Sequence, residues 1–299
     1  MVLDIAIHPD AGAALLHYLR GGAGVVVLPR RLRRKKIVLA QYDTDKLAMG
    51  YAYAHELSRP EGRHLRSRIQ LVDELLASVP HGKLLDAGCG PGILVQKLLD
   101  SPRHDYEITV LDQSSAMVKH CVASTRESGE VHATIGEIEA LPFADETFDV
   151  TVTTGTLEYT DAQAAIKQLS RVTKPGGVVL VSMLNPANPY RLTEWFLYWP
   201  ALRVFSVLQR VFHIHTKRPH GARVTGIRAL NAAKLCRYMR QADLAPFDVV
   251  YFDLTPLVPP LDRIRWLRRW SEGWSRMSVA AHDRRHWLAT GYLLTAKRA

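Results

Sequence analysis

The sequence predicts an α/β fold in which helices cover both faces of a seven-stranded, mostly parallel sheet. Between residues 82 and 184, short apolar runs alternate with helix-like segments, which is typical of βαβ units. A glycine-rich turn from Gly88 to Gly92 leaves the first apolar run and opens a helix. With 299 residues, 47% of them hydrophobic, the chain can bury a full core.

Five strands are expected before residue 184, at Lys83–Ala87, Glu107–Asp112, Val131–Ile135, Asp149–Thr153 and Gly177–Met183. The helices expected between them are Gly92–Asp100, Ser114–Ser124 and Asp161–Val172. The sequence Lys174 to Gly177 ends the last helix and turns into the fifth strand, because proline cannot continue a helix and glycine accepts positive φ. A final pair, Phe247–Asp253 and His286–Lys297, completes seven strands.

The segments on either side of the core indicate a division of the chain into four regions. We expect an N-terminal helical cap over residues 1–81, the core over 82–184, an inserted helical lid over 185–241, and strands that complete the sheet over 242–299. Within the cap, residues 43–79 form helices that break at residues 59–62, where a proline and a glycine occur.

Charge and cysteine content narrow the functional class. The net charge is +10, but residues 41–184 hold thirteen Lys/Arg against twenty Asp/Glu, and residues 185–299 hold nineteen against seven. Basic flanks suit an anionic substrate, a membrane surface or nucleic acid; no nucleic-acid recognition module is visible, which makes that partner unlikely. Three cysteines without a CxxC pair and a first segment without a signal peptide predict a cytoplasmic protein.

The glycine-rich turn carries the strongest functional signal. It comprises Asp86, Gly88, Cys89, Gly90 and Gly92, between an apolar run and a helix. The glycines let the backbone pass close beneath a bound nucleoside, and the helix N-terminus offers free N–H groups to a carboxylate. A dinucleotide fold would need a third glycine one place later, where this chain has Ile93.

The second strand ends in Asp112, twenty positions after Gly92. An acid at this strand tip can accept hydrogen bonds from both ribose hydroxyls of a nucleoside. Gln113 to Met117 follows as a serine-capped helix start. The alternative is that Asp112 only caps this helix.

Three further segments follow in order: Gly136 to Phe143, Phe148 to Tyr159, and Arg171 to Gly177. With the two preceding motifs they resemble the class I S-adenosylmethionine-dependent methyltransferases of Rossmann-like fold, in the small-molecule branch that includes ubiquinone and menaquinone methyltransferases. The resemblance covers residues 82–184 and implies S-adenosylmethionine as cofactor. It places cofactor contacts at Asp86, Gly88, Cys89, Gly90, Gly92, Asp112, Gln113, Met117, Glu137, Ile138 and Thr154. Near the adenine, Glu137 is a longer acid than is usual in the family, and Ile138 replaces the usual small residue.

Methyl transfer requires that the enzyme align the acceptor atom with the methyl group and, for a hydroxyl or an activated carbon, remove one proton from the acceptor. Glu158 and Tyr159, just past the fourth strand, are the first candidates for substrate contact, and His55 is a candidate base. Where some quinone O-methyltransferases place an E-x-x-E-H metal cluster, this chain has Gly155, Glu158 and Tyr159, so we expect no metal.

For two aromatic stretches the sequence allows more than one location in the fold. Trp195 to Trp199 either lines an apolar acceptor pocket or contacts a membrane surface, and Trp266, Trp270 and Trp274, spaced at four residues, either pack in the core or face an interface. We expect methylation of an oxygen or carbon on a hydrophobic small molecule, with peripheral contact to an anionic membrane surface as a further option. An RNA methyltransferase or a non-catalytic cofactor-binding subunit are the alternatives; the sequence does not give the oligomeric state.

Overall fold

A computed structural model describes residues 43–299 except 57–59, 80–81, 103–104, 130, 194–195, 198–199, 202–226, 259–260 and 262–263. The side chain of His55 is not among those described, although His55 lies within helix α3 (Asp45–Glu56). The aromatic residues Trp195 and Trp199 fall outside the described residues.

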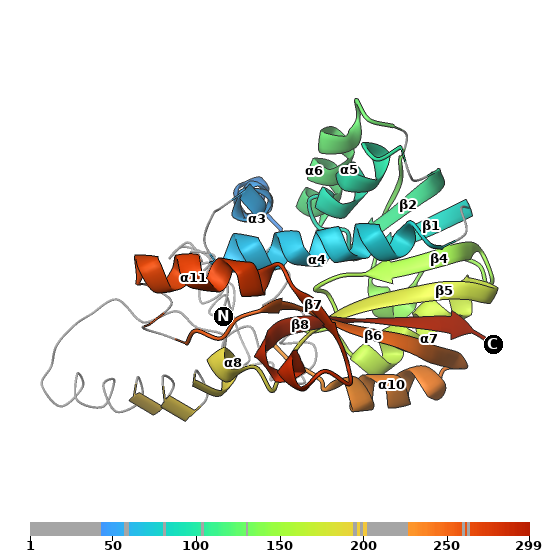
Figure 1. Ribbon diagram of the computed structural model, residues 1–299. Helices are drawn as coiled ribbons and strands as arrows, with labels where there is room; N and C mark the ends of the chain where they lie inside the picture. Colours follow the sequence, from blue (N-terminus) through green and yellow to red (C-terminus); the bar gives the residue numbers. More distant parts are fainter. Residues whose placement is uncertain are drawn as a thin grey trace, which may run out of the picture.

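One eight-stranded sheet forms the centre of the molecule, in the order β3-β2-β1-β4-β5-β8-β6-β7 (Figure 1). Its strands are β1 (Gly82–Ala87), β2 (Tyr106–Asp112), β3 (Val131–Ile135), β4 (Phe148–Thr153), β5 (Thr173–Leu184), β6 (Leu244–Leu254), β7 (Ser278–Ala280) and β8 (Ala289–Arg298). Strands β1 to β5 are parallel, whereas β8 runs antiparallel to β5 and β6. The predicted fold class is confirmed.

The strand count differs from the prediction by one. Strand β7 adds three residues that pair antiparallel with β6 at the edge of the sheet. Three residues are too few to show the apolar alternation by which a strand is recognised in sequence, so this strand was not predicted.

Strand β5 starts four residues earlier than expected. Thr173 already pairs with Phe148, and the next pair is Val178 with Val150. The residues between them, which include Gly176 at φ 76°, loop out as a bulge opposite Asp149. The proline and glycines therefore interrupt the strand ladder rather than precede it.

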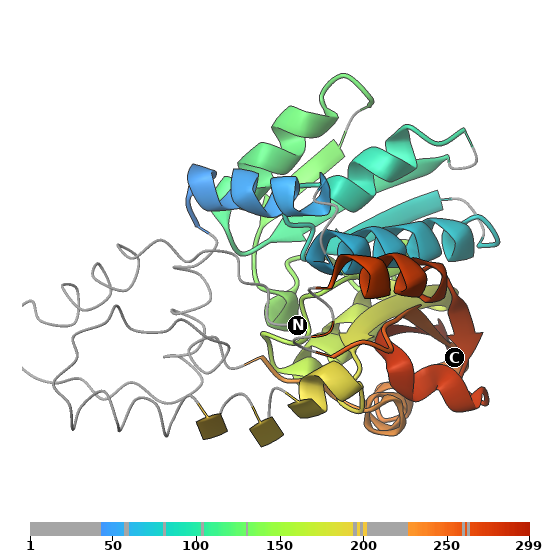
Figure 2. The same cartoon turned by 60° about the vertical axis from the view of Figure 1, so that its left-hand side comes forward.

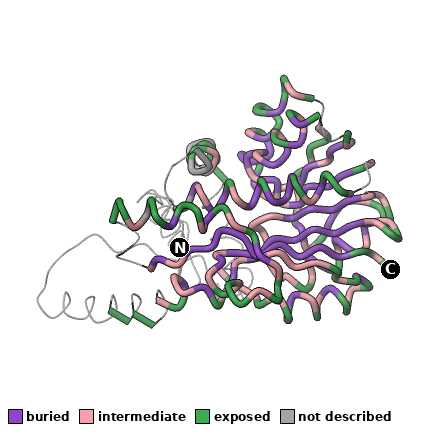
Figure 3. Tube along the Cα trace, viewed as in Figure 1, coloured by how far each residue is buried: buried purple, intermediate pink, exposed green. Residues whose placement is uncertain are grey.

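Helices lie on both faces of the sheet. On one face α4 (Pro60–Leu76), α5 (Ile93–Leu99) and α6 (Ser115–Thr125) supply apolar residues to a core cluster with β1, β2 and β4. On the other, α7 (Ala162–Val172) and α10 (Ala232–Arg240) pack in a second cluster with β5, β6 and β8. The central strands β1, β5 and β8 are buried along most of their length (Figure 3), so the strand ends are where ligands can reach this part of the sheet.

The tryptophan stripe lies on α11 (Arg265–Ser275), beside α4 (Figure 2). Trp266 and Trp270 are 69% and 57% exposed, whereas Trp274 is partly buried against the core. Core packing therefore accounts for one of the three tryptophans. Among the described residues, no helix combines the length and apolar character required to cross a membrane.

Candidate functional site

The glycine-rich turn is folded against the neighbouring strand ends. The backbone N–H groups of Gly88 and Cys89 both donate to the carbonyl of Leu111, at 2.6 and 3.1 Å. Gly88 has φ 91°, and a Cβ there would overlap the hydroxyl of Thr156. The chain needs glycine at this position because the turn lies directly against the loop that follows β4.

Gly92 is required for a different reason. It caps α5 at φ 88°, and a Cβ there would lie 2.7 Å from the Sγ of Cys121 in α6. This glycine permits close packing of two helices, and it lines neither of the two cavities described below, although the sequence placed it among the cofactor contacts.

Asp112, at the end of β2, orders the same region. Its Oδ2 accepts from Gly90 N at 3.0 Å and its Oδ1 from Ser114 N at 2.9 Å, while Ser114 caps α6 through Met117 N. Burial raises the pKa of Asp112, and these backbone hydrogen bonds oppose that shift. A carboxylate oxygen can accept two hydrogen bonds, so Asp112 can support the helix start and still accept ribose hydroxyls.

A second acid, Asp86, lies below the turn. It is 1% exposed, and its Oδ1 has no hydrogen-bond partner among the described residues. Burial, reinforced by the nearby charge of Asp112, raises the pKa of Asp86 to about 7, with Arg68 acting in the opposite direction. An orphaned buried carboxylate suits a cationic ligand group.

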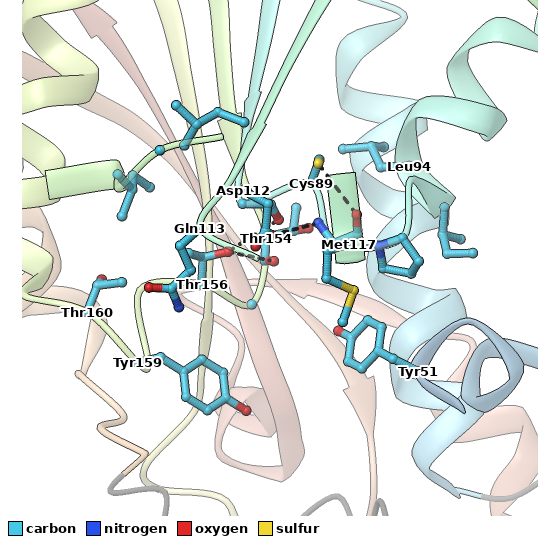
Figure 4. Close-up of a pocket in the computed structure, with 18 of the residues that line it drawn as sticks. Tyr51, Cys89, Leu94, Asp112, Gln113, Met117, Thr154, Thr156, Tyr159 and Thr160 are labelled. Carbon is cyan, nitrogen blue, oxygen red and sulfur yellow. Dashed lines mark hydrogen bonds between the residues drawn. The ribbon is translucent and has the colours of Figure 1, made fainter. Parts of the chain in front are cut away.

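The glycine-rich turn and Asp112 border the first cavity, which comprises about 930 Å³ of space that is partly open to solvent. Of the predicted cofactor residues, those that line it are Gly88, Cys89, Gly90, Asp112, Gln113, Met117, Ile138 and Thr154. Tyr51 of α3 and Tyr159, from the segment after β4, stand on opposite sides of it (Figure 4).

Asp86, Gly92 and Glu137 do not line the first cavity. Glu137 is exposed, whereas Ile138 is buried at the start of a short 3-10 helix, η1 (Ile138–Ala140). The next acid, Glu139, lines the cavity instead and accepts from the backbone N of Asp161 at 3.1 Å. The bulky apolar Ile138 takes the buried position between the two acids. Glu137 is therefore exposed to solvent, whereas Glu139 lies at the cavity.

A second cavity of about 640 Å³ adjoins the first and shares Tyr51, Arg68, Gly155 and Tyr159 with it. Glu158 lines this second cavity and is 3% exposed. Its Oε1 accepts from Leu184 N at 3.1 Å, and burial raises its pKa. The structure therefore brings Glu158 and Tyr159 together, while the side chain of His55 lies outside the described part.

Arg68 of α4 lines both cavities. It is 6% exposed, donates weakly to the hydroxyl of Tyr51 at 3.4 Å, and has no described partner for its Nε. Arg191 of α8 (Pro189–Thr193) adds a further buried cation to the second cavity. Sequence reasoning selected neither arginine.

His64 was also missed, and it lines the second cavity with Thr290. Its Nδ1 lies 2.6 Å from Thr290 Oγ1, which in turn donates to Asp253 Oδ2 at 2.7 Å. These three residues come from α4, β8 and β6 and are far apart in sequence, so no local motif could reveal them. Among the described residues, no group of three or more His, Cys, Asp or Glu side chains could hold a metal ion.

Comparison with known proteins agrees with this geometry. A family model described as a methyltransferase domain matches residues 85–181. A ubiquinone/menaquinone biosynthesis C-methyltransferase of Geotalea daltonii is 30% identical over 138 residues, 44% of this chain and 58% of that protein. A malonyl-[acyl-carrier protein] O-methyltransferase of Pseudescherichia vulneris is 34% identical over 143 residues, 46% of this chain and 53% of that protein.

The chain spans about half the length of these curated relatives. Among solved structures, a SAM-dependent methyltransferase from Thermotoga maritima aligns with a TM-score of 0.55 at 17% identity, covering 85% of this chain and 98% of that one. At that identity the likeness concerns the fold.

Proposed function

Because the chain belongs to the class I S-adenosylmethionine-dependent methyltransferases, we propose that it transfers a methyl group to an oxygen or carbon atom of a small organic acceptor. The observation that carries this proposal is the junction of the two cavities. One is built from the glycine-rich turn and Asp112, and the other holds polar groups able to contact an acceptor. Ligands of open α/β sheets bind at these strand ends.

S-adenosylmethionine fits the residues of the first cavity. Asp112 would accept the ribose hydroxyls, the backbone at Gly88 and Gly90 would lie against the nucleoside, and the orphaned Oδ1 of Asp86 would face the cationic methionine end. The bound cofactor supplies an activated methyl group. The chain's own task is to align the acceptor with it and to control one proton.

For the second cavity we propose an acceptor with a polar head and an apolar body. Glu158, Tyr159, Arg68 and Arg191 offer hydrogen bonds and charge to the head. The aromatic sequence from Trp195 to Trp199 supports an apolar body. The relatives named above are a ubiquinone/menaquinone biosynthesis C-methyltransferase and a malonyl-[acyl-carrier protein] O-methyltransferase, and these names support an organic metabolite, free or carrier-bound, as the acceptor class.

Calorimetry and a radiolabel assay test this proposal. The full chain should bind S-adenosylmethionine and S-adenosylhomocysteine but not NADH, and it should transfer a labelled methyl group into small organic molecules of a cell extract. Binding with no turnover would instead indicate a non-catalytic subunit, and label entering only RNA would indicate an RNA methyltransferase. Failure to bind either nucleoside would overturn the proposal.

A further inference from the structure

The hydrogen bonds around His64 fix which ring nitrogen carries its proton. A threonine hydroxyl has one proton, and the hydroxyl of Thr290 gives it to Asp253 Oδ2 at 2.7 Å. At the 2.6 Å contact with His64 Nδ1, Thr290 Oγ1 must therefore accept. Nδ1 is the donor, and Nε2 of the neutral ring keeps its lone pair.

The other end of this chain of hydrogen bonds is anchored firmly. Asp253 is 1% exposed and holds φ 54° within strand β6, a conformation that costs a non-glycine residue about 1–3 kcal/mol. Its Oδ1 accepts from Arg63 Nε at 2.9 Å. Strained residues that the surroundings hold in place gather at functional sites.

His64 itself has little freedom to move. Its ring stacks on Phe252 with centroids 5.3 Å apart. Among the described residues, Nε2 has no hydrogen-bond partner, and His64 lines the second cavity. Nε2 is therefore the ring nitrogen that is available to act as a base.

From this arrangement we propose that His64 is the general base of the reaction, and that Thr290 and Asp253 are positioning residues that hold its tautomer. The inference rests on the proposed function. Nε2 takes the proton from the acceptor as the acceptor's electron pair bonds to the methyl carbon, and the carbon–sulfur bond breaks with its electron pair left on sulfur. The imidazolium is stabilised by Asp253 through Thr290 and later releases its proton to water.

The charges around His64 favour the neutral, proton-accepting ring. Burial lowers its pKa, Asp253 of β6 opposes this shift, and Arg68 of α4 and Arg191 of α8 lower it further. Glu158, Tyr51 and Tyr159 are the other titratable groups that line the described part of this cavity. A base with a pKa below neutrality is unprotonated and ready at physiological pH.

Glu158 serves the site in another way. Its carboxylate Oε1 accepts from the backbone of Leu184, and its carbonyl accepts from Arg228 N at 2.9 Å. These bonds tie the loop after β4 to the end of β5 and to the segment before α10. Glu158 therefore shapes the second cavity, whereas His64 lines it with a ring nitrogen, Nε2, that none of the described residues contacts by a hydrogen bond.

The decisive variant is His64→Asn, because an asparagine amide can still donate to Thr290 but cannot accept a proton. We expect cofactor Kd within twofold of wild type, and a kcat that is about 10²–10⁴-fold lower. Reduced 1,4-naphthoquinone and malonyl-acyl carrier protein are the acceptor probes. Thr290→Val should lower kcat less than His64→Asn does. His132→Asn, on the exposed side of β3, is the matched control and should leave both the cofactor Kd and kcat unchanged.

A readout independent of turnover keeps the test sharp. In ¹⁵N NMR of the full chain, the His64 resonances, assigned by their loss in His64→Asn, should show the Nδ1–H tautomer. They should titrate below the ordinary histidine value, and kcat/KM should fall on acidification over the same pH range. The Nε2–H tautomer, or a His64→Asn variant that methylates an acceptor as fast as wild type, would overturn the inference. If the wild-type protein did not bind S-adenosylmethionine, the proposed function itself would be overturned.

Discussion

The two cavities meet at four shared residues, yet they are assembled in different ways. The first cavity draws on short segments that end neighbouring parallel strands β1, β2 and β4. The second takes residues from α4, α8 and β8, together with the loop after β4. Parallel βαβ units bring consecutive motifs to one edge of a sheet, whereas the antiparallel strand β8 brings Thr290 beside His64, 226 positions away.

The cavities also differ in charge. Two acids, Asp112 and Glu139, line the first cavity, and the buried Asp86 precedes its glycine-rich turn. The buried arginine Arg191 lines the second cavity beside the acid Glu158, and Arg68 lines both cavities. The acidic side suits a cationic cofactor, and the basic side suits an acceptor that carries or develops negative charge. This contrast gives each cavity its own sensitivity to mutation and pH.

The largest effect should come from Gly88→Val, which breaks the first cavity. The new side chain would meet Thr156 at a φ of 91°. Strain and overpacking together should cost about 2–6 kcal/mol and remove measurable cofactor binding in calorimetry. Gly273→Ala in α11, where a Cβ meets nothing within 4 Å, is the control and should leave binding intact. Wild-type affinity in Gly88→Val would show that the cofactor lies elsewhere.

Asp112→Ala should have the next largest effect, again on the first cavity alone. Loss of the ribose acceptor should weaken cofactor binding by about 1–3 kcal/mol, which is on the order of 10–100-fold in Kd. Calorimetry checks this, and Asp145→Ala, at an exposed acid, provides the comparison. An unchanged Kd would reduce Asp112 to a helix-capping residue.

Asp86 predicts a pH dependence of cofactor binding. Since its pKa lies at about 7 in the free protein, the carboxylate is ionised at pH 8 and largely protonated at pH 6. A cationic ligand favours the ionised form, so affinity should fall up to about tenfold from pH 8 to pH 6 as the ligand must displace a proton. Asp86→Asn should bind weakly with no such slope; a wild-type Kd that is flat across this range would contradict the assignment.

The smallest effect concerns the second cavity and stability. His64 has a folded pKa below its unfolded value, so the unfolded chain binds more protons between the two values. Stability from this group is fully present above about pH 6.5 and is lost as pH falls through the folded pKa, with a slope of at most about 1.4 kcal/mol per pH unit. Urea unfolding of wild type and His64→Asn at pH 7.5 and 5.5 should show a smaller acid loss in the variant. Parallel losses would mean that His64 is not buried as a neutral ring.

The sequence predicted the first cavity far better than the second. Strand β3 has the predicted bounds, and Asp112 lies where the strand tip placed it. Such features depend on residues that are close in sequence, so they can be recognised from the local sequence pattern. The bulge in β5 and the three residues of β7 depend on the partner strand, and no local pattern records them.

The same limit applies to the proton-transfer residues. His55, beside Glu56, was predicted as a candidate base and stays a prediction, since its side chain is not among those described. A histidine acts as a base when burial and an orienting partner set its protonation. For His64 those partners are Thr290 and Asp253, which only tertiary packing brings together. Glu158 and Tyr159 were selected from the sequence because they lie a few residues past the end of β4.

Strand β8 has a consequence for how the protein is made. It follows every other strand of the sheet in the sequence, yet it lies between β5 and β6. On a ribosome, strands β1 to β5 emerge more than 100 residues before Thr290, an interval of about 5–20 s at ordinary rates of synthesis. During that time the nascent chain can assemble the glycine-rich turn, which we propose receives the cofactor, while it still lacks the Thr290 hydroxyl, which we propose orients His64. S-adenosylmethionine would then stabilise the unfinished domain as a ligand before the chain could catalyse any reaction with it.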